Sequence, residues 1–186
     1  MSTPTKYDEV YQQFLATPEY KVAEIIDGTL ITNSRPPSLQ ALAKSALLYE
    51  LYEPFCFSKV GPRGWVILPE PELHLDRDIL VPDIAGWRRE RMPEIPDVVG
   101  VELPPDWICE VLSPSTVAMD RASKLPIYAR HQVTHAWLID PLAQTLEVFR
   151  LTSQHWLLLG TFRDDAKFRA EPFDASELEL AMLWAR

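Results

Sequence analysis

The chain is short of cysteine and glycine. Cys56 and Cys109 are its only cysteines, which is too few for a disulfide framework or a four-ligand zinc site, and two free thiols fit a reducing cytoplasm. Its six glycines are fewer than half of what an average chain of 186 residues holds, whereas its seventeen prolines are nearly twice the average. The composition therefore excludes collagen-like and glycine-rich designs, and it predicts rigid turns between short elements.

Long apolar runs are also missing. No uninterrupted run approaches eighteen residues, and the N-terminal stretch has no apolar signal segment. We find no internal repeat, linker or low-complexity tract. The sequence therefore predicts a soluble cytoplasmic protein with no membrane partner, folded as one domain over residues 1–186.

The best-known catalytic motifs are absent as well. The sequence holds no phosphate-binding loop, no glycine-rich dinucleotide turn, no Gly-x-Ser-x-Gly elbow and no His-Glu-x-x-His. The net charge of −9 argues against a generic nucleic-acid binder, because a phosphate backbone favours a basic face. Any catalytic site has to be sought among single polar residues in apolar surroundings.

The first third of the sequence predicts helices and one hairpin. Residues 5–17 form a short amphipathic pattern that Thr5 can cap, and Asp27-Gly28 is a typical hairpin turn between residues 23 and 32. A second helix is expected from Ser38 to Glu53, ended by Pro54. The apolar stripe that we expect to face the core consists of Leu39, Leu42, Ala46, Leu47 and Tyr49.

Beyond this helix the period becomes that of strands. A helical pattern interrupts them at residues 115–133, and Pro126 implies a kink or a helix that begins near Lys124. The order of elements predicts an α/β or α+β fold with a mixed sheet. The expected strands are 65–68, 72–75, 79–85, 106–113, 134–139, 145–151, 155–162 and 167–173, before a last apolar segment, 178–184.

Two acidic residues lie inside apolar strand patterns. Asp83 follows Ile79–Pro82, and Glu110 lies between Cys109 and Val111. A buried carboxylate is unfavourable unless it is paired, hydrogen-bonded or bound to a metal. Two of them about 4 Å apart repel by roughly 4 kcal/mol at an effective dielectric of 20. Each one alone is explained as a satisfied core acid, but a pair on neighbouring strands favours a cation, and an all-oxygen pair suits Mg²⁺ or Mn²⁺.

The helical pattern that follows adds a lysine. Asp120, Lys124 and Tyr128 recur every four residues and therefore share one face of a helix. One interpretation is a solvated Asp120–Lys124 ion pair. The other is an ammonium directed at the carboxylates, where it would orient a water and offset charge on a phosphate. Asp140, before Pro141, is predicted to cap a turn.

Several motifs taken together resemble the Uma2 (Uma-two) family, which belongs to the restriction-endonuclease-like PD-(D/E)XK superfamily. The resemblance covers residues 7 to 150. Its N-terminal part is the stretch Ala23–Gly28, similar to the family's Glu-Leu-Ile-Asp-Gly element. The other matching motifs are Pro82-Asp83, Glu110-Val111-Leu112-Ser113-Pro114-Ser115-Thr116, Asp120-x3-Lys124-x3-Tyr128-Ala129 and Trp137-Leu138-Ile139-Asp140-Pro141.

The resemblance implies a mixed central sheet flanked by helices, with further strands at the C-terminus. It implies that Asp83 and Glu110 bind Mg²⁺ or Mn²⁺. The superfamily's usual lysine lies two residues after the glutamate, where this chain has Leu112, so the resemblance assigns the lysine role to Lys124. Glu24 matches an acidic position of the family that joins the catalytic set. By analogy with the fold, the chain would form a homodimer that acts on nucleic acid, DNA ahead of RNA.

The substrate contacts follow from the residues after Asp83. Arg88, Arg89 and Arg91 stand on an expected loop, where guanidinium groups can bind phosphate; the alternative is a solvated, charge-mixed loop. Tyr128 either hydrogen-bonds within the site or packs. The sequence thus predicts a metal-dependent endonuclease that hydrolyses phosphodiester bonds. The alternatives are a catalytically silent binding or assembly module with this fold, and a hydrolase of a small phosphorylated molecule.

Overall fold

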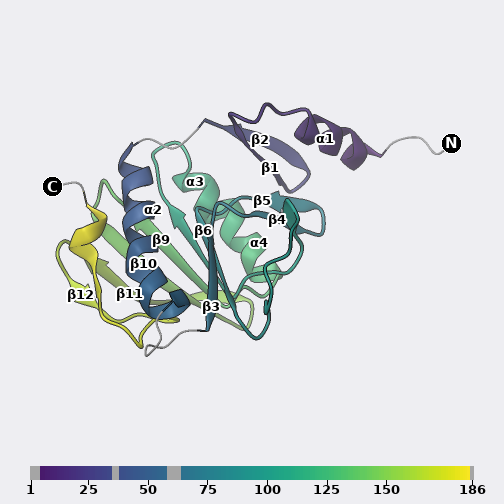
Figure 1. Cartoon of the computed structure of the whole chain (residues 1–186). Helices are drawn as coiled ribbons and strands as arrows, with labels where there is room; N and C mark the ends of the chain where they lie inside the picture. The colour runs from purple at the N-terminus through teal and green to yellow at the C-terminus, as the bar shows by residue number, and fades with distance from the viewer. Residues whose placement is uncertain (1–4, 35–37, 58–63, 185–186) are drawn as a thin grey trace.

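The computed structural model describes residues 5–34, 38–57 and 64–184, and its fold is mixed α+β, as predicted (Figure 1). The larger of its sheets has six strands in the order β11-β10-β9-β8-β6-β3. Only the β8–β9 pair is parallel within that sheet, and the neighbouring pairs are antiparallel. Its strands are β3 (Trp65–Pro69), β6 (Ile84–Arg88), β8 (Trp107–Val111), β9 (His135–Asp140), β10 (Thr145–Thr152) and β11 (His155–Arg163).

The N-terminal region confirms the predicted hairpin. Helix α1 (Lys6–Leu15) begins with a capping box between Thr5 and Asp8. Strands β1 (Val22–Ile26) and β2 (Thr29–Asn33) then pair through a tight turn in which Asp27 and Gly28 have φ angles of 48° and 75°. Glycine adopts this left-handed conformation without penalty and aspartate tolerates it, which is why Asp-Gly is a good hairpin turn. Figure 1 shows α1 and the hairpin together at one end of the molecule.

A second sheet contains the hairpin and corrects one predicted strand. Its order is β2-β1-β5-β4-β7, where the new strands are β4 (Glu72–Leu75), β5 (Asp78–Leu80) and β7 (Gly100–Val101). The single strand expected over residues 79–85 is wrong. The chain leaves β5, passes through Val81-Pro82-Asp83 and enters β6 in the other sheet. Pro82 has no N–H to donate to a ladder, which suits a break at this place.

Helix α2 (Ser38–Leu51) covers one face of the six-stranded sheet with only part of the stripe that we expected. Leu47 is buried and Ala46 packs against the core, as predicted, but Leu39, Leu42 and Tyr49 are exposed. The buried residues of the helix are Gln40, Ala43, Leu47 and Leu51. Pro54 does not end the helical path either. The chain continues from α2 into a π-helical segment, η1 (Tyr52–Phe57), that contains Pro54.

The two faces of the six-stranded sheet have different cores. On the α2 face, alternate residues of β8, Trp107 and Cys109, join a cluster rich in aromatic side chains, so Cys109 is a core residue. On the opposite face, Ile108 and Leu112 pack against α4 (Leu125–Arg130) and the second sheet. Glu110 lies between them along the strand, so its carboxylate faces the second core.

The predicted helical region 115–133 is divided into three pieces. They are α3 (Val117–Met119), a π-helical segment η2 (Asp120–Lys124) and α4, so the regular helix begins beside Pro126, at Leu125. Asp140 accepts hydrogen bonds from the backbone N–H groups of Leu142 and Ala143, which confirms its predicted turn-capping role.

The C-terminal region is less regular than predicted. Within 167–173 only β12 (Lys167–Phe168) is a strand, and it pairs with β13 (Leu178–Glu179), which η3 (Leu180–Leu183) follows. Phe173 is fully buried among Phe55, Trp65, Trp107 and Trp137. This segment therefore completes the aromatic core through side chains and without a long strand. No helix in the described ranges is long and apolar enough to span a membrane.

Candidate active site

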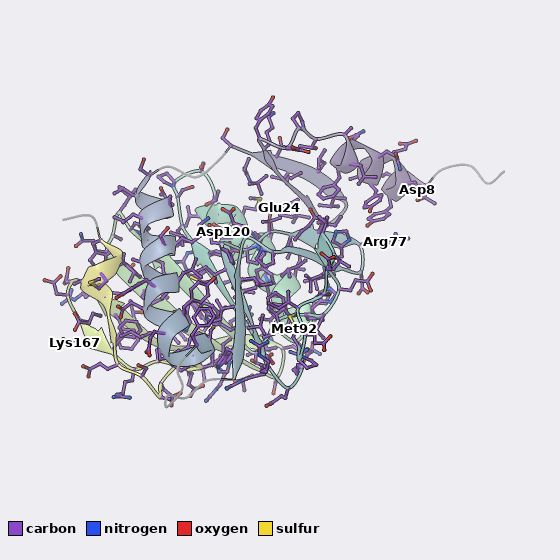
Figure 2. The ribbon with its side chains drawn as sticks, viewed as in Figure 1. Asp8, Glu24, Arg77, Met92, Asp120 and Lys167 are labelled. Carbon is purple, nitrogen blue, oxygen red and sulfur yellow. The ribbon has the colours of Figure 1, made fainter. Side chains whose placement is uncertain are left out.

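A cleft of about 450 Å³ opens where the hairpin, the start of β6, the end of β8 and the segment Ser113–Lys124 meet. Figure 2 labels two of the residues that line the cleft, Glu24 and Asp120. Of the residues that line the cleft, five are acidic and one is a lysine. They are Glu24, Glu70, Asp83, Glu110, Asp120 and Lys124.

Lys124 is the centre of a buried cluster of charges. Its Nζ lies 2.9 Å from Oε1 of Glu24 and 2.9 Å from Oε1 of Glu110, and 3.9 Å from Oδ1 of Asp120. It also donates to the carbonyl oxygen of Val81 at 3.3 Å. Lys124, Glu24 and Glu110 are each at most 3% exposed. The solvated ion pair that we considered for Asp120 and Lys124 is therefore wrong, because both groups are buried.

The carboxylates around Lys124 are fixed by further hydrogen bonds. Oε1 of Glu24 accepts from the backbone N–H of Val81 at 2.8 Å, and the Tyr128 hydroxyl donates to Oε1 of Glu110 at 2.7 Å. Tyr128 is fully buried, so of the two roles that we considered for it the structure has both: it packs and it orients Glu110. The cluster is thus held by three separate parts of the chain, β1, β8 and the helical region.

Asp83 lies beside this cluster, directly before strand β6. Its Oδ2 accepts from the backbone N–H of Val111 at 2.8 Å, directly after Glu110. Its Oδ1 lies 3.5 Å from Nζ of Lys44, and Lys44 also pairs with Glu70. The β6–β8 pairing aligns Ile84 with Cys109, which brings Asp83 and Glu110 to the same end of neighbouring strands.

Burial and like charges alter the protonation of these acids. Burial, with the negative charges of Asp120, Asp83 and Glu24, raises the pKa of Glu110 to about 8, although Lys124 opposes this. Burial likewise raises the pKa of Asp120 to about 6, against the effects of Lys124 and the Thr116 hydroxyl, and it raises the pKa of Asp83. The cleft therefore holds more acidic groups than its lysines neutralise, and it favours an added cation.

The ammonium of Lys124 remains charged in this environment. Burial alone would lower its pKa, but Glu110, Tyr128 and Glu24 outweigh that effect and raise the pKa well above the usual value. A lysine that stays protonated acts as a fixed positive charge and hydrogen-bond donor. It is not suited to accept a proton.

The winding of the helical region determines where Lys124 points. Within η2 the backbone N–H of Leu125 donates to the carbonyl of Asp120, five residues earlier. Such π-helical turns are frequent at functional sites. Asp120 and Lys124 are both buried in η2, and Tyr128 follows on the same side in α4.

The donors around Asp83 and Glu110 fit a hard divalent cation. The contacts described for Glu110 go to Oε1, which leaves Oε2 for another ligand, and Oδ1 of Asp83 has only the longer contact to Lys44. Among the described residues no group of three or more His, Cys, Asp or Glu side chains forms a ready metal site. Mg²⁺ commonly binds through one or two carboxylates and takes its other ligands from water and phosphate, so two carboxylates suffice.

The three predicted substrate arginines lie elsewhere. β6 begins next to Asp83 and ends at Arg88, about 16 Å away at the usual rise per residue. The Arg88 guanidinium stacks over Trp65 at 4.2 Å from the ring centroid, Arg89 donates to the Trp65 carbonyl, and Arg91 pairs with Asp106 at 2.8 Å. The structure thus brings Glu24, Asp83, Glu110, Lys124 and Tyr128 together, but it does not bring Arg88, Arg89 and Arg91 to them.

The sequence did not predict that three further residues lie in or next to the cleft. Gln40 and Lys44 lie one turn apart on α2, and Glu70 stands in the turn between β3 and β4 with a φ of 46°. The four-residue spacing of Gln40 and Lys44 inside an apolar helix was a signal of a shared polar side. Glu70 lies between Pro69 and Pro71, and that pattern indicates a turn without indicating a role.

The comparisons with known proteins agree with this geometry. Residues 8–182 match the family Uma2, described as "Putative restriction endonuclease". A search of curated proteins finds no match. Among solved structures, the chain is similar to a protein from Anabaena variabilis ATCC 29413 described as a "putative nuclease belonging to DUF820", with 25% identity, 97% of each chain covered and a TM-score of 0.72. Because the family match spans nearly the whole chain, the chain belongs to the Uma2 family.

Proposed function

We propose that this protein is a metal-dependent nuclease that hydrolyses phosphodiester bonds, with Asp83 and Glu110 binding Mg²⁺ or Mn²⁺. The observation that carries the proposal is the position of Lys124, 2.9 Å from both Glu24 and Glu110 at the wall of an acidic cleft. A lysine buried between the carboxylates of Glu24 on β1 and Glu110 on β8 is a costly arrangement, and packing alone does not require it. Membership of a family described as "Putative restriction endonuclease" supports the same chemistry.

Each residue of the cluster has a distinct task in this proposal. A divalent cation, when bound, would polarise the phosphoryl oxygens of the substrate. Lys124 donates from its ammonium to the attacking water or to a phosphoryl oxygen as negative charge develops. Glu24 holds Lys124 in place, and the Tyr128 hydroxyl fixes Glu110 through Oε1, so that Oε2 faces its ligand. In the reaction a water oxygen bonds to phosphorus and the opposite ester P–O bond breaks. One water proton is released to solvent, and the leaving ester oxygen takes up a proton from solvent to become a hydroxyl.

Cleavage and metal binding test the proposal together. We would titrate Mn²⁺ into the wild type, Asp83→Asn and Glu110→Gln by calorimetry, with and without a DNA duplex, and follow the cleavage of plasmid DNA with Mg²⁺, Mn²⁺ or chelator. We expect Mn²⁺ binding by the wild type, its loss in both variants, and a loss of cleavage of at least about 100-fold.

A matched control separates this role from a general charge effect. Glu90 is an exposed acid outside the cleft, so Glu90→Gln removes one charge and should leave both measurements unchanged. Persistent cleavage in Asp83→Asn and Glu110→Gln would refute the assignment. A wild type that takes up no Mn²⁺, even with DNA or RNA, would favour a non-catalytic binding module.

The acidic lining favours a second candidate, a hydrolase of small phosphorylated molecules. Five acidic residues at the cleft and a net charge of −9 oppose the long-range attraction of a duplex more than that of a short substrate. Short oligonucleotides and nucleotide phosphodiesters therefore belong in the same assay. Turnover of these without any cleavage of long DNA would select the second candidate.

DNA as the preferred polymer, a homodimer and a cytoplasmic location remain part of the proposal. Two paired copies would present two clefts, one for each strand of a duplex. Sedimentation of the purified chain, and parallel cleavage assays on DNA and RNA of one sequence, test the first two points.

A further inference from the structure

Gln40 is a buried amide at the cleft whose oxygen lacks a partner. Its side chain is 4% exposed and lines the cleft, and its Oε1 has no hydrogen-bond partner among the described residues. A buried acceptor that is left unpaired costs about 1–3 kcal/mol. The other two buried atoms of this kind, Nε1 of Trp107 and Nε2 of His131, belong to residues that do not line the cleft.

The orientation of the Gln40 amide follows from its other contact. Nε2 donates to the carbonyl oxygen of Leu112 at 3.3 Å. Exchanging the amide oxygen and nitrogen would set two acceptors against each other, so the unpaired atom is the oxygen. Leu112 lies two residues beyond Glu110, and Gln40 therefore sits over the end of the strand that carries this carboxylate.

The same side of α2 faces Asp83. Lys44, one turn after Gln40, places its Nζ 3.5 Å from Oδ1 of Asp83, the oxygen that is not bound to the backbone. Gln40 thus lines the cleft from α2, and Lys44 follows it one turn later on the same side of the helix. Asp83 lies next to Lys44, and the end of β8 that carries Glu110 lies beside Gln40.

The chemistry of the surroundings limits what the oxygen can bind. Its cleft neighbours include the carboxylates of Asp83 and Glu110, which are acceptors only when ionised, as a cation ligand must be, and a substrate phosphodiester also offers only acceptor oxygens. Neither can satisfy Oε1. A divalent cation can, because neutral amide oxygens are ordinary ligands of hard cations.

From these contacts we infer that Gln40 is the third protein oxygen donor of the cation site, through Oε1, together with Asp83 and Glu110. This inference rests on the proposed function, since it requires that a cation binds in the cleft. A neutral third donor adds an oxygen without adding a negative charge to the five acids already present. Its Nε2 contact to Leu112 keeps the oxygen in place before the cation arrives.

Two substitutions at Gln40 distinguish the role of the amide oxygen from that of the amide nitrogen. Gln40→Met has a similar size but neither group, and Gln40→Glu keeps an oxygen while it loses the donor to Leu112. Gln132 provides the control: its amide nitrogen also donates to a backbone carbonyl, that of Ala129, away from the cleft, and we would replace it by Met.

The readout is Mn²⁺ affinity, measured from the free-ion electron paramagnetic resonance signal with and without inorganic phosphate. We expect Gln40→Met to bind Mn²⁺ about 10–100-fold more weakly than the wild type. Gln40→Glu should bind at least as tightly as the wild type, and Gln132→Met should match it. Thermal unfolding in chelator should show similar midpoints for the wild type, Gln40→Met and Gln132→Met, which excludes misfolding as the cause of weaker binding.

Each contrary result has one meaning. Equal affinity of Gln40→Met and wild type overturns the inference alone and leaves the nuclease proposal standing. Equal weakening in Gln40→Met and Gln40→Glu also overturns it, because the bond to Leu112 would then be the part that matters. A wild type that binds no Mn²⁺ under either condition overturns the inference and the proposed metal site together.

Discussion

The two ends of strand β6 carry opposite charges, and the surrounding structure treats them differently. At its start, Asp83 adjoins a cluster of acids that share a buried lysine, and the acids outnumber the ammonium groups. At its end, the guanidinium groups of Arg88, Arg89 and Arg91 each have a partner near the surface. The acidic end has unneutralised carboxyl groups that can bind a cation, whereas the arginines of the basic end already contact other residues of the fold.

The comparison also separates two kinds of ion pair. Lys124 and its partners are at most 5% exposed, while Arg91 is 40% exposed in its pair with Asp106. Removing one partner of a buried pair leaves an uncompensated charge, and this is far more destabilising than the loss of a surface pair. The experiments below test that difference, from the largest expected effect to the smallest.

Lys124→Met should lower the free energy of unfolding by about 3–5 kcal/mol at pH 8, because Glu24 and Glu110 would stay buried without their cation. Denaturant unfolding measures this loss. Lys167→Met is the control, since Lys167 pairs with Glu179 at the surface, where both side chains are about half exposed; its effect should be much smaller than that of Lys124→Met. Similar losses of unfolding free energy in the two variants would show that the buried ion pairs matter no more for stability than the exposed one.

The free energy of unfolding should fall as the pH rises from 4.5 to about 8 in the absence of metal. The pKa of Glu110 is about 8 in the folded chain against 4.5 when unfolded, so in this window the folded state holds the extra proton. Each unit of such a difference is worth about 1.4 kcal/mol. Asp120, with a pKa of about 6, acts in the same direction over the lower part of this range.

Unfolding midpoints at a series of pH values, with chelator present, check this dependence. Glu110→Gln carries no titrating group and should flatten the profile above pH 6. A wild-type protein that becomes more stable between pH 6 and 8 would contradict the raised pKa. It would mean that Lys124 outweighs burial in determining the charge of Glu110.

Tyr128→Phe should cost about 1.5–3 kcal/mol at pH 8, because it removes the 2.7 Å hydrogen bond to a charged carboxylate without changing the packing. The loss should be smaller at pH 5, where Glu110 is protonated. Tyr52→Phe, at a partly buried tyrosine that packs against the aromatic core, serves as the control. Equal losses of unfolding free energy at both pH values would show that the strength of this hydrogen bond does not depend on the charge of Glu110.

Arg91→Ala should change the free energy of unfolding by about 1 kcal/mol or less, since Asp106 keeps its bond from the Arg88 backbone N–H. If the protein binds DNA, replacing Arg88, Arg89 and Arg91 together by Ala should leave the salt dependence of binding unchanged. A shallower slope of log K against log salt would mean that phosphates reach the basic end of β6, as the sequence analysis suggested.

Much of the site was predictable because it depends on local anomalies. An acid in the middle of an apolar strand, as at Glu110, and a lysine, acid and tyrosine at a spacing of four are unusual enough to stand out. The hairpin at Asp27-Gly28 was predictable for a similar reason, since few dipeptides adopt that turn easily. The resemblance added Glu24, which by pattern alone reads as an ordinary strand residue.

The features that the sequence did not predict depend on how separate elements pack against one another. Helix α2 has apolar residues on nearly every side, so its sequence does not determine which side packs on the sheet. The side that does so carries the small residue Ala43. The sequence around Asp83 reads as one strand, yet the chain crosses there from one sheet to the other. Gln40 gained its place at the cleft from that packing. Its spacing from Lys44 indicates a shared polar side, but it does not indicate which part of the molecule that side meets.

The π-helical turn at Asp120–Lys124 has a consequence for how this family is aligned. Such a turn accommodates one residue more than the α-helix in the same length of axis. A relative whose helix is regular throughout would present its lysine to the same carboxylates from one position nearer the glutamate. Alignments that allow no gap between Val117 and Leu125 would then set the lysine of such a relative beside Ser123, and a complete site would be counted as a broken one.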